Sequence, residues 1–203
     1  MMPATRLVFL VFFVSILWLP APGHPLPPAN EEAPWVTPIA NQLLLSRMGK
    51  WGRCRDYTFL DPSAECSRVP VPLDYNDPWG RGIEIFTFRY LGAGTNKKGQ
   101  IWFLEGGPGG SGKLLSKIML HLATYYPDFD YYGLDHRGVG DSTRFGCPGD
   151  NDFGEDWTSY RTCYESLEQQ WGTGLQAFNT TNAARDLQLV VSRFRKEGMP
   201  VFI

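Results

Sequence analysis

The stretch Ile101–Lys113 reads IWFLEGGPGGSGK, and it decides how the rest of the chain is interpreted. Ile101–Leu104 is a short apolar run, typical of a strand that is buried on both faces. Five glycines and a proline follow within the same stretch. Apolar residues then recur at helical spacing, at Leu114, Leu115, Ile118, Met119 and Leu122. A strand, a glycine-rich turn and a helix in this order direct backbone N–H groups towards the space above a sheet, so the stretch predicts a site for a permanent or transient anion.

Three interpretations of the glycine-rich turn compete. A phosphate-binding loop is favoured by Gly107, Gly112 and Lys113, which fit G-x-x-x-x-G-K, but Leu114 stands where the motif needs Ser or Thr to hold magnesium. A loop that donates an N–H to an oxyanion is favoured by the run Gly106–Gly109. The third interpretation is a purely structural turn. The remaining sequence has to decide between them.

Composition and charge narrow the functional class. A chain of 203 residues allows one domain with a small appendage. A hydrophobic content of 43% and an aromatic content of 14% are typical of a globular, core-forming chain. The net charge of -2 gives no electrostatic reason to expect a nucleic acid as partner.

The N-terminal residues predict export. Arg6 precedes the apolar run Leu7–Leu19, and prolines and small residues follow up to Gly23. This pattern is typical of a signal peptide at residues 1–23, and the run is short for a span that takes about 20 residues. An uncleaved membrane anchor is the alternative. We therefore expect a protein that is secreted or lies in the endomembrane lumen, with no membrane contact after cleavage.

Four cysteines agree with an oxidising compartment: Cys54, Cys66, Cys147 and Cys163. They allow three connectivities, of which the local pairing, Cys54 with Cys66 and Cys147 with Cys163, needs the least rearrangement of the chain. Their spacing fits neither a zinc site nor a thioredoxin-type motif, so we expect no metal and no cofactor. The sequon Asn179-Thr180-Thr181 predicts N-glycosylation in a secreted chain.

The order of predicted elements indicates an α/β fold with a mostly parallel sheet and an antiparallel hairpin at its edge. Residues 24–50 are predicted as a proline-rich linker and a short helix at Ile39–Met48, and residues 143–180 as irregular. Thr180 or Thr181 is predicted to cap the last helix. The predicted elements are a stapled loop at 51–68, an edge strand at 69–75, strands at 83–91, 101–104 and 129–134, helices after the glycine loop and at 181–195, and a strand from 201.

Four motifs together carry a family resemblance. Cys54 and Cys66 lead into VPVPLDY at 69–75, GGPGGSG stands at 106–112, DHRGVGDS at 135–142, and a helix carrying Asp186-Leu187 leads into the strand at Val201. With these motifs the chain resembles the N-terminal half of a secreted α/β-hydrolase of the prolyl- and tripeptidyl-aminopeptidase-like serine peptidases. The resemblance covers Cys54–Ile203. It implies an incomplete α/β-hydrolase domain at 51–203.

The resemblance implies hydrolysis of peptide substrates near their N-termini by acyl-enzyme chemistry with a Ser–Asp–His triad. The nucleophile of this family lies on a G-x-S-x-G turn, which would follow the strand that begins at Val201. Neither Ser111 nor Ser142 has the required glycines, and His121 and His136 are not placed as the base. We therefore expect the nucleophile, acid and base beyond Ile203, and a fragment that is inactive and poorly folded on its own.

What remains of the site in this chain is half of an oxyanion hole. Gly107 is the expected backbone donor and Gly106 the second choice, since Pro108 has no N–H. Glu105 is expected to be a partner of the loop backbone or of Arg137, or else to bind the ammonium group of a substrate. The motif of Asp135 and Arg137, with glycines at Gly138 and Gly140, is interpreted as an ion-paired structural turn.

Two other functions stay open. The chain could be a secreted, non-catalytic binding or interaction protein built on the half-fold. Alternatively, the hydrolase fold could belong to an esterase or lipase.

Overall fold

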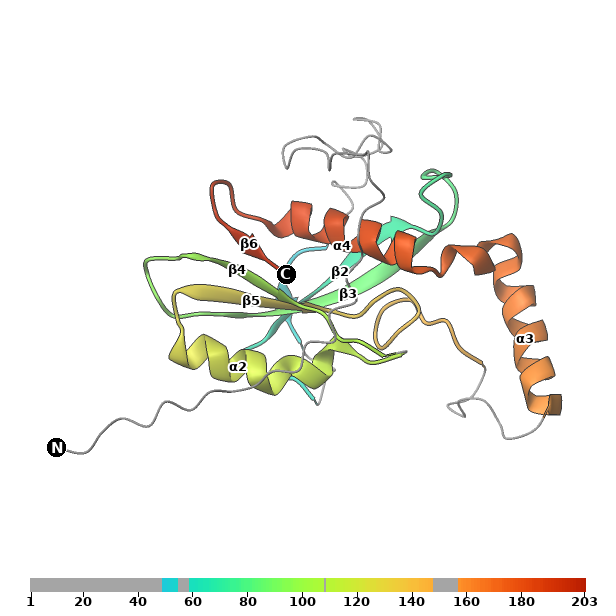
Figure 1. The fold of residues 1–203 in the computed structure, drawn as a ribbon, viewed down its shortest axis with the longest axis horizontal. Coiled ribbons are helices and arrows are strands. Elements are labelled where there is room, and N and C mark those ends of the chain that lie inside the picture. The colour runs from blue at the N-terminus through green and yellow to red at the C-terminus, as the bar shows by residue number, and fades with distance from the viewer. Residues whose placement is uncertain (1–48, 55–58, 108, 148–156) are drawn as a thin grey trace, which may run out of the picture. The chain divides into compact units, whose positions relative to one another are not determined.

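A computed structural model of the protein describes residues 49–54, 59–107, 109–147 and 157–203, which contain a six-stranded mixed sheet (Figure 1). The strand order is β1-β2-β3-β5-β4-β6. The predicted signal peptide, the linker and the short helix at Ile39–Met48 lie outside the described residues. The strands are β1 Gly52–Arg53, β2 Glu65–Pro72, β3 Gly82–Leu91, β4 Gly99–Phe103, β5 Phe129–Leu134 and β6 Val201–Phe202.

β2 and β3 form the predicted antiparallel hairpin. β2 pairs with β3 along its whole length, from Glu65 opposite Arg89 to Pro72 opposite Gly82. On its other side β2 pairs only at its start, where β1 lies opposite Glu65 and Cys66. Pro72 and the proline two positions before it therefore lie in the part of β2 that no second described strand borders. Proline, which has no N–H to donate, is tolerated in such a place.

β5, β4 and β6 run parallel to one another, and the order in which the chain adds strands across the sheet reverses at β4. β4 pairs in parallel with β5 on one side and with β6 on the other. The connection from β4 to β5 crosses one face of the sheet through α2 (Ser116–Tyr125), and the connection from β5 to β6 crosses the opposite face through α4 (Thr180–Phe194) (Figure 1). The carboxyl end of β4 is thus the topological switch point, where open α/β sheets bind their ligands.

Two hydrophobic cores lie on the two faces of the sheet, since successive side chains of a strand point to opposite sides. The core on the α2 face is built on aromatic residues and Met119, and the core on the α4 face is built mainly on branched aliphatic residues, with Trp102 stacked on Tyr132 at 4.6 Å. Buried strand residues on the α2 face are Phe86, Phe88, Tyr90 and Tyr131, and those on the α4 face are Val69, Val71, Ile83, Ile85, Trp102, Tyr132 and Leu134.

The helix after the glycine loop differs from the prediction in two respects. It begins as a 3₁₀ turn, η1 (Gly112–Leu115), before α2 starts. The residues of the predicted apolar face do not all point inwards: Leu114 is 74% exposed and Ile118 is 52% exposed. The buried face of α2 consists of Ser116, Met119 and Ala123, two of which are small enough to bring the helix close to the sheet.

The region predicted as irregular contains a helix, α3 (Trp157–Trp171), and a 3₁₀ turn, η2 (Gly172–Ala177). The sequence prediction missed α3 because the helix is largely polar, and the buried residues in its part from Tyr160 to Trp171 are limited to Cys163, Leu167 and Trp171, spaced four apart. None of the helices in the described ranges is long and apolar enough to cross a membrane.

The cap of α4 was also predicted one residue too late. Asn179, not Thr180 or Thr181, is the N-cap, and its side chain accepts a hydrogen bond from the Asn182 N–H. Asparagine is among the preferred N-cap residues because its short side-chain oxygen reaches the free N–H groups of the first turn.

A buried carboxylate lies at the amino end of the parallel strands. Asp130 of β5 is fully buried and pairs with Lys97 at 2.6 Å and Lys196 at 3.0 Å. Burial alone would raise the pKa of Asp130, but the hydrogen bonds from the two lysines outweigh it and hold the pKa below its usual range. Asp130 thereby joins β5 to the segment that follows α4.

This carboxylate should make stability depend on pH in the acid range. Because the pKa of Asp130 is lower in the folded state than in the unfolded state, its contribution is complete above about pH 4 and is lost as the pH falls through the folded-state pKa. We expect Asp130→Asn to lower the free energy of unfolding at pH 7 by about 2 kcal/mol. It should also weaken the loss of stability between about pH 5 and pH 2. Urea unfolding at a series of pH values measures both, and an equal acid slope in the two proteins would contradict the prediction.

Candidate oxyanion site

The glycine-rich loop lies at the carboxyl end of β4, which is the switch point of the sheet. β4 ends at Phe103 and η1 begins at Gly112, so the loop bridges the strand and the start of the α2 layer. Ser111 caps η1, and its side-chain oxygen accepts a hydrogen bond from the Lys113 N–H. Strand, loop and helix thus occur in the order that the sequence predicted.

The glycines of the loop are exposed, and several of them are required by its path. Gly106 and Gly107 are both exposed, and a Cβ on Gly106 would meet no atom within 4 Å. A Cβ on Gly107 would lie 2.5 Å from the Gly109 nitrogen, so the loop folds back on itself there. Gly109 has φ +86°, a conformation that favours glycine. Both predicted donors therefore lie on an exposed part of the loop at the switch point.

Asp135 ties the end of the loop to the neighbouring turn. Its buried carboxylate accepts hydrogen bonds from Ser111 Oγ at 2.8 Å, from the Gly112 N–H at 2.7 Å and from the Asp141 N–H at 2.7 Å. Gly112 also packs against the Leu134 carbonyl so closely that no Cβ would fit. A single side chain at the end of β5 thus fixes both the loop that follows β4 and the turn that follows β5.

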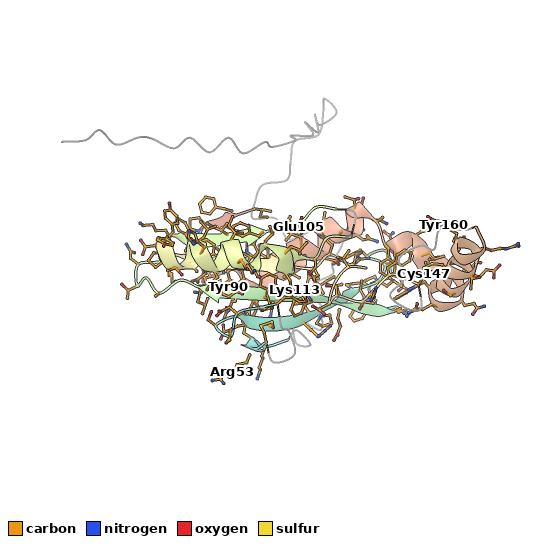
Figure 2. All side chains as sticks on the ribbon, turned by 90° about the horizontal axis from the view of Figure 1, so that it is seen from below. Arg53, Tyr90, Glu105, Lys113, Cys147 and Tyr160 are labelled. Atoms are coloured by element: carbon orange, nitrogen blue, oxygen red, sulfur yellow. A yellow bond between two sulfur atoms is a disulfide. The ribbon has the colours of Figure 1, made fainter. Side chains whose placement is uncertain are left out.

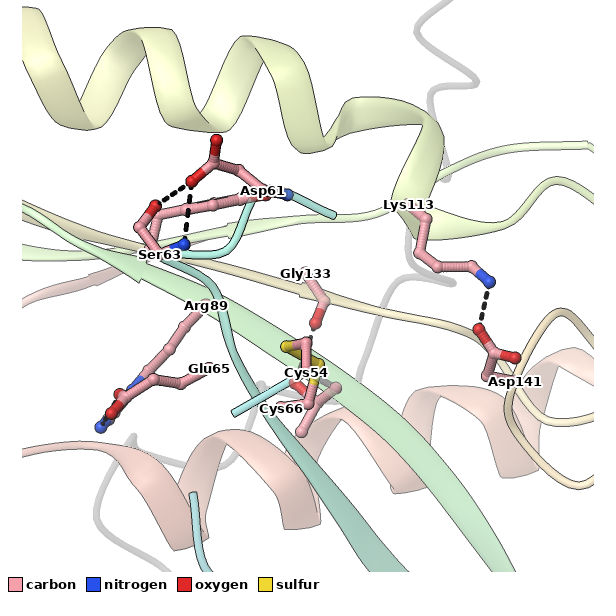
Figure 3. The surroundings of a disulfide bond; sticks show 11 residues. Cys54, Asp61, Ser63, Glu65, Cys66, Arg89, Lys113, Gly133 and Asp141 are labelled. Atoms are coloured by element: carbon pink, nitrogen blue, oxygen red, sulfur yellow. Dashed lines mark hydrogen bonds and ion pairs between the residues drawn. A yellow bond between two sulfur atoms is a disulfide. The ribbon is translucent and has the colours of Figure 1, made fainter. Parts of the chain in front are cut away.

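Further bonds hold the turn to β3 and to η1. Ser142 Oγ donates to the Asp135 carbonyl at 2.6 Å and accepts from the Phe86 N–H of β3 at 2.9 Å. Lys113 forms an ion pair with Asp141 across the gap between η1 and the turn (Figure 3). In a phosphate-binding loop this lysine would bind the phosphate groups of the ligand. Here Lys113 is paired with a carboxylate, which favours the oxyanion interpretation over the phosphate one.

Arg137 is buried and has a partner that the sequence prediction did not name. Its guanidinium makes a two-pronged ion pair with Asp186 of α4, with both N–O distances 2.7 Å. It also donates to three carbonyl oxygens, those of Leu73 at 2.7 Å, Ala177 at 2.8 Å and Pro72 at 3.1 Å. Arg137 of the turn is therefore ion-paired to Asp186 of α4 and not to the adjacent Asp135.

The environment of Asp186 makes its charge depend on Arg137. Burial raises the pKa of the Asp186 carboxyl above its usual range, against the hydrogen bonds from Arg137 and Tyr75, which favour the carboxylate. Burial and the Asp186 charge also raise the pKa of the Tyr75 phenol, which donates to Asp186 at 2.8 Å. Arg137, Asp186 and Tyr75 thus join the end of β2, the turn after β5, η2 and α4 in one network.

The glycines of the turn have the conformations expected of a tight structural turn. Gly138 has φ +85° and Gly140 has φ +56°. A Cβ on Gly140 would collide with the carboxylate of Asp135, and a Cβ on Gly138 would lie 2.9 Å from Cβ of Phe145. These glycines let the turn wrap closely around Asp135.

Glu105 lies at the start of the loop and is half-buried (Figure 2). A Cβ on Gly110 would lie 2.6 Å from Cγ of Glu105, so the glutamate side chain packs on the returning part of the loop. The expectation that Glu105 pairs with Arg137 is wrong, because Asp186 is the carboxylate partner of Arg137. Packing on the loop and contact with a substrate ammonium remain the two roles for Glu105.

Neither of the two described histidines is placed to act as a general base. His121 is exposed on α2 and its ring lies 4.4 Å from that of Tyr125. His136 follows Asp135, and its Nδ1 is buried and has no hydrogen-bond partner among the residues that the structure describes. Within the described residues, no group of three or more His, Cys, Asp or Glu side chains could hold a metal ion.

Two disulfides with the local connectivity fasten segments that flank the sheet. Cys54 and Cys66 join the end of β1 to β2, with Cα atoms 5.1 Å apart (Figure 3). Cys147 and Cys163, also with Cα atoms 5.1 Å apart, join the segment after the structural turn to α3. The disulfides are typical of an oxidising compartment.

Sequence reasoning missed several residues that shape the site. Ser111 and Ser142 were considered only as nucleophiles, yet both are hydrogen-bonded to Asp135. The motif that contains Asp186 predicts no role for it. The signal that could have identified it is a lone acidic residue among the inward-facing positions of an amphipathic helix, since buried charges are almost always paired.

A scan against models of protein families found no match. Among curated proteins, the tripeptidyl aminopeptidase of Streptomyces lividans is 30% identical over 109 residues, which cover 51% of this chain and 20% of that protein. Carboxylesterase B of Mycobacterium tuberculosis is 30% identical over 131 residues, covering 62% of this chain and 25% of that protein. The matched segments thus make up a quarter or less of each relative. The matches confirm the predicted resemblance to tripeptidyl-aminopeptidase-like hydrolases and include an esterase.

A cold-adapted esterase from an Arctic intertidal metagenomic library has a similar solved structure, with a TM-score of 0.34, 14% identity, and coverage of 75% of this chain and 53% of that one. At this score the overlap adds nothing to the argument. The strand order, the crossover helices on both faces and the sequence matches to hydrolases together confirm the predicted fold class. The chain has a partial α/β-hydrolase fold, but its sheet is mixed rather than mostly parallel. β5, β4 and β6 pair in parallel, whereas β1 with β2, β2 with β3 and β3 with β5 pair antiparallel.

Proposed function

We propose that this chain forms the oxyanion-loop half of a secreted serine-type hydrolase that acts on peptide N-termini by acyl-enzyme chemistry. The observation that carries the proposal is the exposed Gly106–Gly107 segment at the carboxyl end of β4, fixed through Gly112 by the buried Asp135. The similarity to tripeptidyl aminopeptidases supports the choice of substrate class. The nucleophile, acid and base would come from residues beyond Ile203.

In this mechanism the Gly107 N–H, or that of Gly106, donates to the substrate carbonyl oxygen as it becomes negative. A preorganised donor of this kind contributes about 3–4 kcal/mol to stabilising the transition state, because it needs no reorientation during the reaction. The glycine backbone lets the substrate approach closely. Glu105, beside the loop, would bind the ammonium group of the peptide N-terminus.

An esterase is the second candidate. The match to carboxylesterase B covers 62% of this chain, more than the 51% covered by the match to the S. lividans aminopeptidase. The backbone donors of an oxyanion loop serve amide and ester hydrolysis equally, so Gly106 and Gly107 do not discriminate between the two candidates. Glu105 favours the peptidase, because an ester substrate has no ammonium group for it to bind.

The coding sequence downstream of Ile203 provides the first test. A continuation that encodes G-x-S-x-G shortly after the strand would support the proposal, and an immediate stop codon would contradict it in favour of a non-catalytic binding protein. The longer protein encoded by such a continuation should then hydrolyse tripeptidyl-amide substrates faster than simple acyl esters. The opposite preference would favour the esterase.

In the longer protein, Gly107→Ala should lower the rate of the chemical step without weakening substrate binding. The added Cβ would force the loop away from Gly109, and displacing an oxyanion donor should lower kcat about 10²-fold with little change in KM. Gly52→Ala is the control, since a Cβ there meets no atom within 4 Å on the exposed strand β1. Steady-state kinetics on a tripeptidyl amide measure the effect. Unchanged kcat in Gly107→Ala would exclude this segment from the oxyanion hole.

A further inference from the structure

The sequon Asn179-Thr180-Thr181 lies at the start of α4 and has no part in the proposed hydrolysis. It is the one N-x-S/T sequence in the chain. All three residues are exposed. The backbone of Asn179 is extended, with φ -136° and ψ 165°, and helical geometry begins at Thr180. Both the asparagine and the hydroxyl-bearing residue of the sequon are therefore accessible at the surface.

The side-chain amide of Asn179 is already used by the fold. Its Oδ1 accepts a hydrogen bond from the Asn182 N–H at 2.8 Å, and its Nδ2 donates to the Gln176 carbonyl at 2.7 Å. An asparagine amide carries two N–H donors on Nδ2. The second N–H has no partner in the part of the chain that the structure describes.

We propose that Asn179 carries an N-linked glycan and caps α4 at the same time. Glycosylation forms a bond between Nδ2 and C1 of an oligosaccharide and breaks the bond from C1 to its lipid-pyrophosphate carrier, which leaves with the electron pair while Nδ2 loses one proton. Oδ1 takes no part in this reaction, so the cap to Asn182 is retained. The remaining N–H on Nδ2 keeps the bond to Gln176.

The glycan would lie at the edge of the sheet where the glycine loop lies. β5 ends at that edge, α4 leads back to the amino end of the parallel strands, and β6 begins opposite Gln100. The N-terminus of α4, with Asn179, is therefore at the carboxyl edge. The proposal does not depend on the hydrolase function, because it needs only entry into the secretory pathway.

Translation of the whole chain with microsomal membranes tests the modification. Protection from added protease reports translocation, and a mass shift removed by an endoglycosidase reports the glycan. We expect both for the natural chain, for Thr180→Ala and for Thr181→Ser, which keep the sequon, and protection without the shift for Thr181→Ala and Asn179→Asp. A protected natural chain without the shift would overturn the proposal, as would a natural chain that is not protected.

Hydrogen exchange tests whether glycan and cap coexist. Aspartate is also a good N-cap, whereas alanine is a poor one. The Asn182 amide should therefore exchange at similar rates in the glycosylated chain and in Asn179→Asp, and about fivefold faster in Asn179→Ala. Exchange in the glycosylated chain as fast as in Asn179→Ala would show that the glycan displaces the cap.

Discussion

Arg137→Met is expected to lower the free energy of unfolding by about 3–5 kcal/mol, the range found when one partner of a buried ion pair is removed. The side chains of Arg137 and Asp186 are both 2% exposed, so the remaining carboxylate would be left uncompensated in the interior. The three carbonyl oxygens of Pro72, Leu73 and Ala177 would lose their donor as well. Because the chain ending at Ile203 is expected to fold poorly alone, the change is measured, here and for the variants below, in the oxidised protein that continues beyond Ile203. Urea unfolding followed by circular dichroism gives the free energy.

Arg161→Met is the matched control. Arg161 also pairs with a carboxylate, Glu165 at 3.2 Å, but its side chain is 82% exposed, and such pairs contribute about 0–1 kcal/mol. The double variant Arg137→Met with Asp186→Leu should recover part of the loss, because it removes the isolated charge but leaves the three carbonyls without donors. A change below 1 kcal/mol in Arg137→Met would show that the network does not hold the fold.

Asp135→Ala should cost about 3 kcal/mol and release the end of the glycine loop. The substitution leaves the Ser111 hydroxyl and the N–H groups of Gly112 and Asp141 without an acceptor, and hydrogen bonds to a charged group contribute about 1.5–3 kcal/mol each. Entry of water at the partly buried Ser111 and Asp141 would offset some of this loss. Urea unfolding gives the stability, and the exchange rate of the Gly112 amide gives the local effect.

Two variants separate the loop from the rest of the Asp135 network. Ser111→Ala removes the hydroxyl bond to Asp135 and the cap on the Lys113 N–H but keeps the Asp135 carboxylate. It should therefore speed exchange at Gly112 with a small change in global stability, about 1 kcal/mol. Asp128→Ala is the control, since Asp128 pairs with the exposed Lys98 at 2.8 Å and should contribute less than about 1 kcal/mol. Equal protection of Gly112 in Asp135→Ala and in the natural chain would contradict the role of Asp135 as the anchor of the loop.

The strands could be predicted from the sequence because their signals are local. Alternation in Ile83–Leu91 and the apolar run at Ile101 placed β3 and β4 to within two residues. The prolines predicted an edge strand at 69–75, whereas β2 spans Glu65–Pro72, begins inside the predicted loop at 51–68, and is bordered at its start by β1. Turns and helix ends were less predictable. Asn179 was overlooked as a cap because the neighbouring threonines fit the same preference. In its part from Tyr160 to Trp171, α3 is held by the disulfide at Cys163 and by two further buried residues, Leu167 and Trp171, which leave a weak periodic signal.

The position of the glycine loop could be predicted from the sequence, but the residues that hold the loop and the neighbouring turn in place could not. Gly106 and Gly107 were placed by the strand–glycine–helix order alone. The partners of Asp135 and Arg137 were not, since each is made by residues that only the folded chain brings together, up to 65 positions apart for Arg137 and Pro72. A motif such as DHRGVGDS marks residues that need partners, but their identity depends on the strand order and on which helix packs over the turn.

The attachment of the turn to Asp135 has a consequence for where this chain can tolerate insertions. Asp135 and Asp141 are six positions apart and joined by a hydrogen bond, and Ser142 and Thr143 bond in turn to the backbone of β3. An extra residue anywhere between Asp135 and Thr143 would break the geometry of these hydrogen bonds, because the backbone must return to β3 after a fixed number of residues. The same insertion at the exposed Thr95 and Asn96, between the anchored Gly94 and Lys97 in the connection before β4, would meet no such constraint from the site. Changes in chain length should therefore occur at the amino edge of the sheet and be absent from the turn that holds the glycine loop.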